Sequence, residues 1–173
     1  RMLLVLSAPS IHDTYYKKAF QQIIDFQISY ANSIIGNDNV VIIADEDTKK
    51  YFEGKVPADI LLEDEVHDIW MRDFTTVNPE NPVQFVYTWA SMTQAESIDV
   101  QKSLKKFADR YKIKRITTDL LIDGGNVVDN YKGRVITTTR FMEDNQLKYA
   151  EAKEELKEIF GAKEVAVIEP DET

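Results

Sequence analysis

Two short blocks hold the residue types with the most chemical potential. The first, residues 68–73, reads DIWMRD and follows a predicted strand. If Trp70 and Asp73 face one cleft, they could bind a flat cation. The carboxylate would accept two parallel hydrogen bonds from a guanidinium, and the indole would pack on its face. Arg72 would need its own partner, for which Asp68 is a candidate. The alternative is a tryptophan anchored in the core beside a surface Arg–Asp pair.

The second block, residues 120–126, reads LLIDGGN, so that a predicted buried strand ends on Asp123 and is followed by Gly124, Gly125 and Asn126. Paired glycines allow a positive φ or the close approach of another backbone or a ligand. A carboxylate at the end of a strand is well placed for catalysis. The alternative is a tight turn capped by Asp123 and Asn126.

Other familiar chemistries are not indicated. The sequence contains no GxGxxG, Walker-type or GxSxG motif, and neither of its two histidines, His12 and His67, has a second histidine at metal-ligand spacing. Carboxylates near His67 favour a solvated acidic loop over a hard-metal site. The chain has no cysteine, which excludes disulfides, thiolate zinc sites and a cysteine nucleophile within it. We therefore expect no metal and no cofactor.

Composition narrows the classes of partner. With 21 Lys and Arg against 30 Asp and Glu, the net charge is −9, which disfavours nucleic-acid binding and suits cationic ligands. No apolar run approaches the roughly 18 residues of a membrane span, and the apolar start is too short for a secretory signal. We expect a cytoplasmic protein, with secretion from a bacterium as the alternative.

Hydrophobic periodicity predicts three strand–helix–strand units, which open at Met2, Val83 and Arg134. The predicted strands cover residues 2–6, 40–44, 60–62, 83–89, 116–122, 127–130, 134–138 and 165–168, and the predicted helices cover 13–35, 48–52, 97–111 and 147–160. Either a doubly wound parallel sheet or a ring of small βαβ modules fits this α/β pattern. No linker or composition break divides residues 1–173, so we expect one partial domain. The start at Arg1 and the stop after a strand-like run indicate a fragment.

Taken together, the blocks resemble one family: the agmatine deiminases and bacterial (Porphyromonas-type) peptidyl-arginine deiminases, guanidino-modifying enzymes of the pentein, or α/β-propeller, fold. Residues 68–74 are similar to the W-x-R-D block of the family. Residues 123–129 and 132–138 are similar to its E-G-G-N block and the hairpin that follows, and residues 169–173 resemble the segment before its G-H-x-D motif. The likeness covers the N-terminal half of a typical member. It implies an incomplete pentein fold with about three modules.

The resemblance also implies roles for individual residues. Asp73 matches an aspartate that holds the guanidinium, Trp70 matches the aromatic residue that lines that pocket, and Asp123 matches the carboxylate that orients a catalytic histidine. Asp68, Arg72, Gly124, Gly125 and Asn126 match the supporting positions of these blocks. In the family, a cysteine thiolate attacks the guanidinium carbon, ammonia leaves, and water releases a ureido product from the thiouronium adduct.

This sequence departs from the family in three ways. Asp123 stands where many members have the longer Glu, the second aspartate and the catalytic histidine would lie beyond Thr173, and the cysteine is absent. We therefore expect the N-terminal part of a deiminase that acts on agmatine or an arginyl peptide, inactive alone and active only with the missing C-terminal half. The open apolar faces and strand edges of such a half also predict self-association or marginal stability. A non-catalytic module that binds guanidinium ligands is the second hypothesis, and an α/β domain whose blocks are only turns and core is the third.

Overall fold

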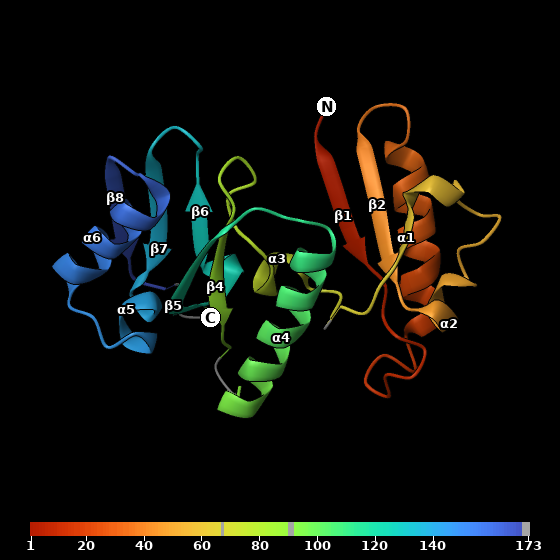
Figure 1. The fold of residues 1–173 in the computed structure, drawn as a ribbon, viewed down its shortest axis with the longest axis horizontal. Helices are drawn as coiled ribbons and strands as arrows, with labels where there is room; N and C mark the ends of the chain where they lie inside the picture. Colours follow the sequence, from red (N-terminus) through yellow and green to blue (C-terminus); the bar gives the residue numbers. More distant parts are fainter. Residues whose placement is uncertain (67, 90–91, 171–173) are drawn as a thin grey trace. The chain divides into compact units, whose positions relative to one another are not determined.

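The computed structural model describes residues 1–66, 68–89 and 92–170, and it shows a mixed α/β fold (Figure 1). The chain divides into two compact units, Arg1–Met71 and Arg72–Thr173. Among the described residues the strands form three separate sheets, an arrangement that fits small modules better than one doubly wound sheet. The expectation of one partial domain stays a prediction.

The first unit is a three-stranded parallel sheet with its helices. Strands β1 (Leu3–Ser7), β2 (Asn39–Ala44) and β3 (Leu61–Glu63) lie in that order. Helix α1 (Phe20–Ile34) connects β1 to β2, and the short helices α2 (Glu46–Lys49) and η1 (Ala58–Ile60) precede β3. The fully buried Ile24, Ile42 and Phe52 join helix to sheet in one apolar core. This unit confirms the first predicted strand–helix–strand module.

Helix α1 is shorter than the periodicity predicted. Its first residue is Phe20, and turns occupy residues 11–19. Tyr16 fits the spacing of the apolar helix face and is indeed buried, but it lies in the preceding turn and its hydroxyl bonds to Asp68. Tyr16 is therefore buried because of its contact with a distant segment. Its spacing from the residues of α1 matches a helix face although it is not helical.

The second unit contains the other two modules. Strands β4 (Val83–Tyr87) and β5 (Ile116–Ile122) are parallel, and α4 (Gln94–Arg110) connects them. Strand β6 (Val127–Asp129) pairs antiparallel with β7 (Arg134–Thr138), which confirms the predicted hairpin. Strand β8 (Glu164–Ile168) runs parallel to β7, after α5 (Thr139–Asp144) and α6 (Tyr149–Phe160). A single apolar core, with Phe141 and Leu156 at its centre, unites the strands and α6.

Four of the described short helices come where the sequence predicted no helix: η1 in the first unit, α3 (Met71–Phe74) inside the first block, η2 (Gly124–Asn126) inside the second, and α5 directly after the hairpin. The last three lie beside the residues singled out for chemistry, so these local turns matter for the site. None of the described helices is long and apolar enough to cross a membrane. His67, the centre of the expected acidic loop, lies outside the described residues.

Candidate functional site

The first part of the DIWMRD block is held by Tyr16. The Tyr16 hydroxyl donates to Asp68 Oδ1 over 2.5 Å, and the same carboxylate oxygen accepts the Ile69 N–H at 2.6 Å. The Trp70 side chain also hydrogen-bonds Tyr16, and because its indole N–H can only donate, the Tyr16 oxygen is the acceptor. The contacts of Tyr16 and Asp68 therefore fix the conformation of the first part of the block, residues 68–70.

Electrostatics keep this arrangement protonated at Tyr16. Burial, the hydrogen bond to Asp68 and the charge of that carboxylate raise the pKa of Tyr16, while the hydrogen bond from Trp70 acts in the opposite direction. The hydroxyl thus remains a donor at neutral pH. Trp70 itself is 58% exposed although one edge is tethered. A tethered and open indole is suited to stacking on a ligand, and it is not the core anchor of the alternative interpretation.

The second part of the block is helix α3, which presents Arg72 and Asp73. Phe74 is buried and its ring packs against Tyr87 on β4, which anchors this helix in the second unit. The Arg72 guanidinium donates to the Val127 carbonyl at 2.7 Å. The sequence suggested an ion pair between Asp68 and Arg72. Instead, Asp68 accepts the Tyr16 hydroxyl, and Arg72 donates to the backbone at the start of β6.

The DGGN block forms a tight turn. Asp123 follows β5 and caps η2, with its Oδ1 accepting the Gly125 N–H at 2.8 Å. Asn126 locks the turn to the end of β7: its Oδ1 accepts the Thr138 hydroxyl at 2.8 Å, and its carbonyl accepts the Thr137 hydroxyl at 2.7 Å. The capped turn that the sequence allowed is therefore present, and the functional interpretation must rest on what else meets it.

Gly124 brings the two blocks together. A Cβ added to this buried residue would lie 2.2 Å from the Arg72 carbonyl oxygen and 3.1 Å from that of Asp73. No side chain fits there without moving backbone. Glycine is thus required for close approach, which is the second of the two reasons that the sequence offered for the pair.

The carboxylates of Asp73 and Asp123 converge at Gly125. A Cβ built on Gly125 would lie 3.1 Å from Asp123 Oδ1 and 3.4 Å from Asp73 Oδ1, so the two oxygens flank one point from opposite blocks. Both side chains are partly exposed. Although the two aspartates are fifty residues apart in the chain, one oxygen of each thus lies near the same point.

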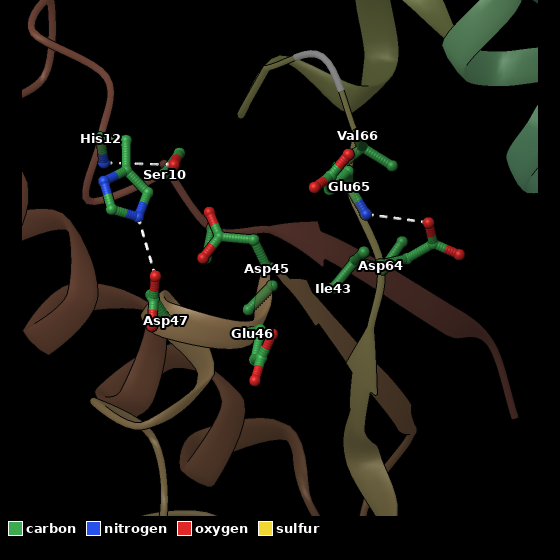
Figure 2. A pocket seen from close by; sticks show the side chains of 11 residues that line it. Ser10, His12, Ile43, Asp45, Glu46, Asp47, Asp64, Glu65 and Val66 are labelled. Carbon is green, nitrogen blue, oxygen red and sulfur yellow. Dashed lines mark hydrogen bonds and ion pairs between the residues drawn. The ribbon is translucent and has the colours of Figure 1, made fainter.

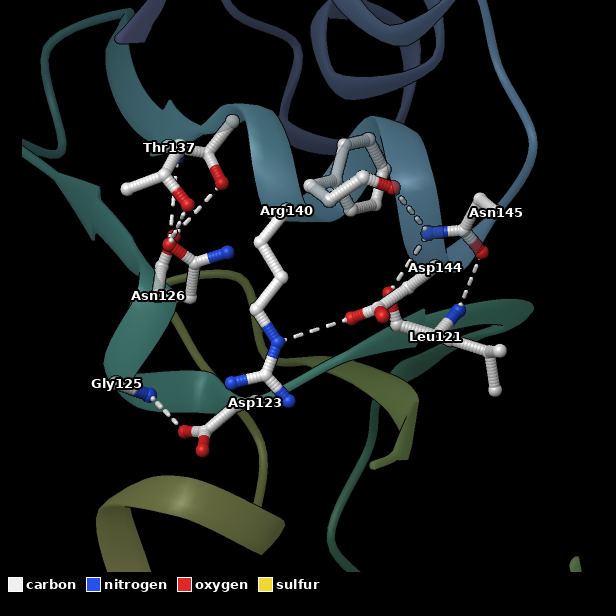
Figure 3. Close-up of polar contacts among 10 residues, drawn as sticks. Leu121, Asp123, Gly125, Asn126, Thr137, Arg140, Asp144 and Asn145 are labelled. Carbon is white, nitrogen blue, oxygen red and sulfur yellow. Dashed lines mark hydrogen bonds and ion pairs between the residues drawn. The ribbon is translucent and has the colours of Figure 1, made fainter. Parts of the chain in front are cut away.

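Sequence reasoning missed the helix that lies over Asp123. In Figure 3 the side chain of Arg140, on α5, extends toward Asp123, and its Nε lies 3.4 Å from Asp144 Oδ2. Asn145, which ends α5, hydrogen-bonds the backbone of Leu121. The four-residue spacing of Arg140 and Asp144 was the available signal for a helix here.

An acidic hollow in the first unit also escaped notice. It has a volume of about 360 Å³ and lies at the carboxyl ends of the parallel strands, where Asp45, Asp47 and Asp64 line it (Figure 2). Asp45 caps α2 through the Thr48 N–H, and Asp47 pairs with His12 at 2.9 Å and with Lys50 at 2.7 Å. These contacts of Asp45 and Asp47 hold α2 and the loop after β1 at the rim of the hollow. Among the described residues no group of three or more His, Asp or Glu side chains is placed to hold a metal ion.

Comparison with known families decides the assignment. The family model of the Porphyromonas-type peptidyl-arginine deiminases matches residues 2–173. The chain belongs to this family. The predicted resemblance, which rested on the W-x-R-D and G-G-N blocks, is thereby confirmed. Comparison with curated proteins gives no significant match.

Solved structures agree on the fold. The agmatine deiminase of C. jejuni is 20% identical with a TM-score of 0.79, and the match covers 98% of this chain and 53% of that one. A variant of that enzyme with substrate bound gives 0.74 at the same identity and coverages. The agmatine deiminase of Enterococcus faecalis is 14% identical with a TM-score of 0.70, covering 96% of this chain and 50% of that one. The chain thus spans about half the length of these structures.

Proposed function

We propose that this chain provides the N-terminal, guanidinium-holding part of a guanidino-group deiminase of the pentein fold. The observation that carries the proposal is the convergence of Asp73 and Asp123 on Gly125, in a chain whose family is that of the peptidyl-arginine deiminases. Two carboxylates near one point favour a planar cation, because each can accept N–H bonds from a guanidinium.

Each residue has a role in this proposal. Asp73 accepts hydrogen bonds from the guanidinium. Trp70 keeps the role that the family resemblance implies for it, an exposed ring for cation–π contact. Asp123 uses Oδ1 for its own turn, so its other oxygen is left to attract the guanidinium in this chain and, where the C-terminal half is present, to orient the histidine that the family employs. Asp68, Arg72, Gly124, Gly125 and Asn126 hold these groups through the contacts described above. No metal or cofactor is part of the proposed chemistry.

The complete reaction needs groups that these 173 residues lack. A thiolate must attack the guanidinium carbon, ammonia must leave with a transferred proton, and water must then cleave the C–S bond to give the ureido product. The sequence holds no cysteine. We therefore propose that turnover of agmatine or an arginyl peptide depends on a C-terminal half that supplies the thiol, which a second copy of these residues cannot do, in keeping with relatives that are about twice as long.

A non-catalytic binding module is the second candidate. The net charge of −9 suits cationic ligands, which such a module would bind without chemistry. It uses the same carboxylate pair, so both proposals predict guanidinium binding. They differ in whether any assembly of the chain releases ammonia.

Agmatine titration of the full chain at low ionic strength, followed by NMR, tests the shared step. We expect Asp73→Asn to weaken binding at least tenfold, about 1.4 kcal/mol, because a charge-assisted hydrogen bond is lost. Asp45→Asn is the matched control, since Asp45 also follows a parallel strand but lies in the first unit, and it should leave the affinity unchanged. Equal affinities for the wild type and Asp73→Asn would refute the site.

Ammonia assays test the mechanism. The chain alone should release none from agmatine, because the thiol is missing. Turnover by the chain alone, abolished by Asp73→Asn so that contamination is excluded, would overturn the thiol-dependent mechanism while supporting the site.

A further inference from the structure

The edge of β5 next to Asp123 is completed by a side chain. Among the strands that the structure describes, β5 pairs with β4 alone. Successive residues of a strand point their N–H and C=O groups to alternate sides, so every second residue offers both groups at the open edge. Leu121, two residues before Asp123, does so.

Asn145 satisfies both groups of Leu121. Its Oδ1 accepts the Leu121 N–H at 2.7 Å, and its Nδ2 donates to the Leu121 carbonyl at 2.8 Å. The same Nδ2 donates to the Phe141 carbonyl at 2.8 Å, inside α5 (Figure 3). The side-chain amide thus makes the two hydrogen bonds that a neighbouring strand would make with Leu121. It also links β5 to the last turn of α5.

The other end of α5 is tied to the far side of the same turn. Asn126 Oδ1 accepts both the N–H and the hydroxyl of Thr138, the residue immediately before the helix. Helix α5 is therefore fixed at both ends across residues 121–126, with Asp123 between the two anchors. Phe141, fully buried, seats the helix on the apolar core.

We propose that Asn145 is a positioning residue that sets the Asp123 carboxylate against Asp73. This inference rests on the proposed guanidinium site and adds to it a residue from an element that belongs to neither block. The side-chain hydrogen bonds of Asn145 go to the backbone of Leu121 and Phe141, both among the described residues, and not to either carboxylate. It acts through Leu121. By hydrogen-bonding the backbone of Leu121, it fixes the end of β5 and so the position of the turn that carries Asp123.

The test measures agmatine affinity by NMR titration of the full chain. We expect Asn145→Ala to raise the Kd at least fivefold in protein with a native circular dichroism spectrum, because Leu121 loses both partners. Asn145→Ser, which keeps a short polar group at the helix end but cannot span to Leu121, should act alike and provides a second variant if the alanine protein folds poorly. Asn32→Ala is the control, since Asn32 donates to a backbone carbonyl in the first unit, that of Lys55.

A double-mutant cycle separates positioning from general stability. If Asn145 acts through Asp123, then Asn145→Ala should change the Kd less than twofold in an Asp123→Asn background. Additive losses in the cycle, or an unchanged Kd in folded Asn145→Ala and Asn145→Ser, would overturn the inference. If the wild-type chain bound no agmatine, the proposed function itself would fail, a result distinct from either.

Discussion

Asp45 and Asp123 stand at equivalent places in the two units, and their surroundings differ. Each follows a parallel strand and caps a short helix. Asp45 accepts hydrogen bonds from Ser10, in the loop after β1, and from the Thr48 N–H, the Thr48 side chain and the Asp47 N–H. Asp123 accepts the Gly125 N–H and meets a second carboxylate, that of Asp73, which comes from a distant segment. An aspartate at the end of a strand can therefore serve only as a helix cap, and its position alone does not indicate a binding site.

The two glycines explain why only one of the caps becomes a candidate site. Gly124 lets the Arg72 backbone come within a distance that any Cβ would block, and this contact carries Asp73 to the turn. After Asp45 the chain continues with Glu46 and Asp47 in place of two glycines, and Asp47 pairs with Lys50 and His12. What distinguishes the second unit is thus the close contact between the backbones of Gly124 and Arg72. That contact brings the Asp73 carboxylate near the Asp123 carboxylate.

Replacing Gly124 by alanine should break the comparison most severely. The added Cβ would lie 2.2 Å from the Arg72 carbonyl oxygen, and backbone must shift to make room. We expect a loss of about 3 kcal/mol in the free energy of unfolding, the upper range for overpacking, measured by urea denaturation. Agmatine binding should fall with it, since the shift displaces Asp73.

Gly54→Ala provides the control in the first unit. Gly54 has a φ of +73°, but an added Cβ meets no described atom within 4 Å. Only the left-handed conformation then opposes the change, at about 1 kcal/mol. Equal losses for Gly124→Ala and Gly54→Ala would show that close approach is not what demands glycine at position 124.

The sequence predicted the scaffold better than the site. Apolar runs such as 116–122 marked strands because burial requires them, and the three parallel strand–helix–strand units followed. Helix α5 was missed because its approach, the threonines at 137–139, favours a strand. The partner of Arg72 was unpredictable for another reason: it is a backbone carbonyl, and every residue has one.

The convergence of the two aspartates illustrates the same limit. Composition and spacing allowed Asp73 and Asp123 to meet but could not require it, since fifty residues and a whole βαβ module lie between them. Family resemblance supplied the expectation, and the Gly124 contact supplies the physical reason. Two glycines directly after an aspartate at the end of a strand allow such a backbone contact. They do not predict it unless it is already known which second segment packs against them.

A smaller effect is expected from Tyr16→Phe in the first unit. The change removes the hydroxyl that donates to Asp68 and accepts from Trp70, and it should lower the free energy of unfolding by about 1 kcal/mol. The indole N–H proton of Trp70, assigned through Trp70→Phe, should shift in NMR spectra as it exchanges Tyr16 for water. Tyr15→Phe is the matched control, because that neighbouring ring is 84% exposed. Identical stability of the two variants would contradict the role given to the Tyr16 hydroxyl.

The smallest expected effect concerns acid stability at Asp45. Partial burial pushes the pKa of this carboxyl upward, but hydrogen bonds from Ser10, Thr48 and the Asp47 N–H outweigh it and hold the pKa below its ordinary value. A depressed pKa in the folded state means that the unfolded chain binds the proton more readily. The stabilisation is therefore complete well above the ordinary pKa, about 3.9, and is lost as the pH falls through the lower folded value.

Asp45→Asn isolates this contribution, because asparagine is also a good helix N-cap and keeps the acceptor for the Thr48 N–H. Urea midpoints measured from pH 6 down to about pH 3 should show the wild type more stable at the upper end and the gap closing toward the lower end. The acidic groups shared by both proteins, Asp47 included, cancel in the difference. A gap that stayed constant across this range would mean that the Asp45 carboxylate is no better bonded in the folded first unit than in the unfolded chain, and the contrast with Asp123 would then rest on the Gly124 contact alone.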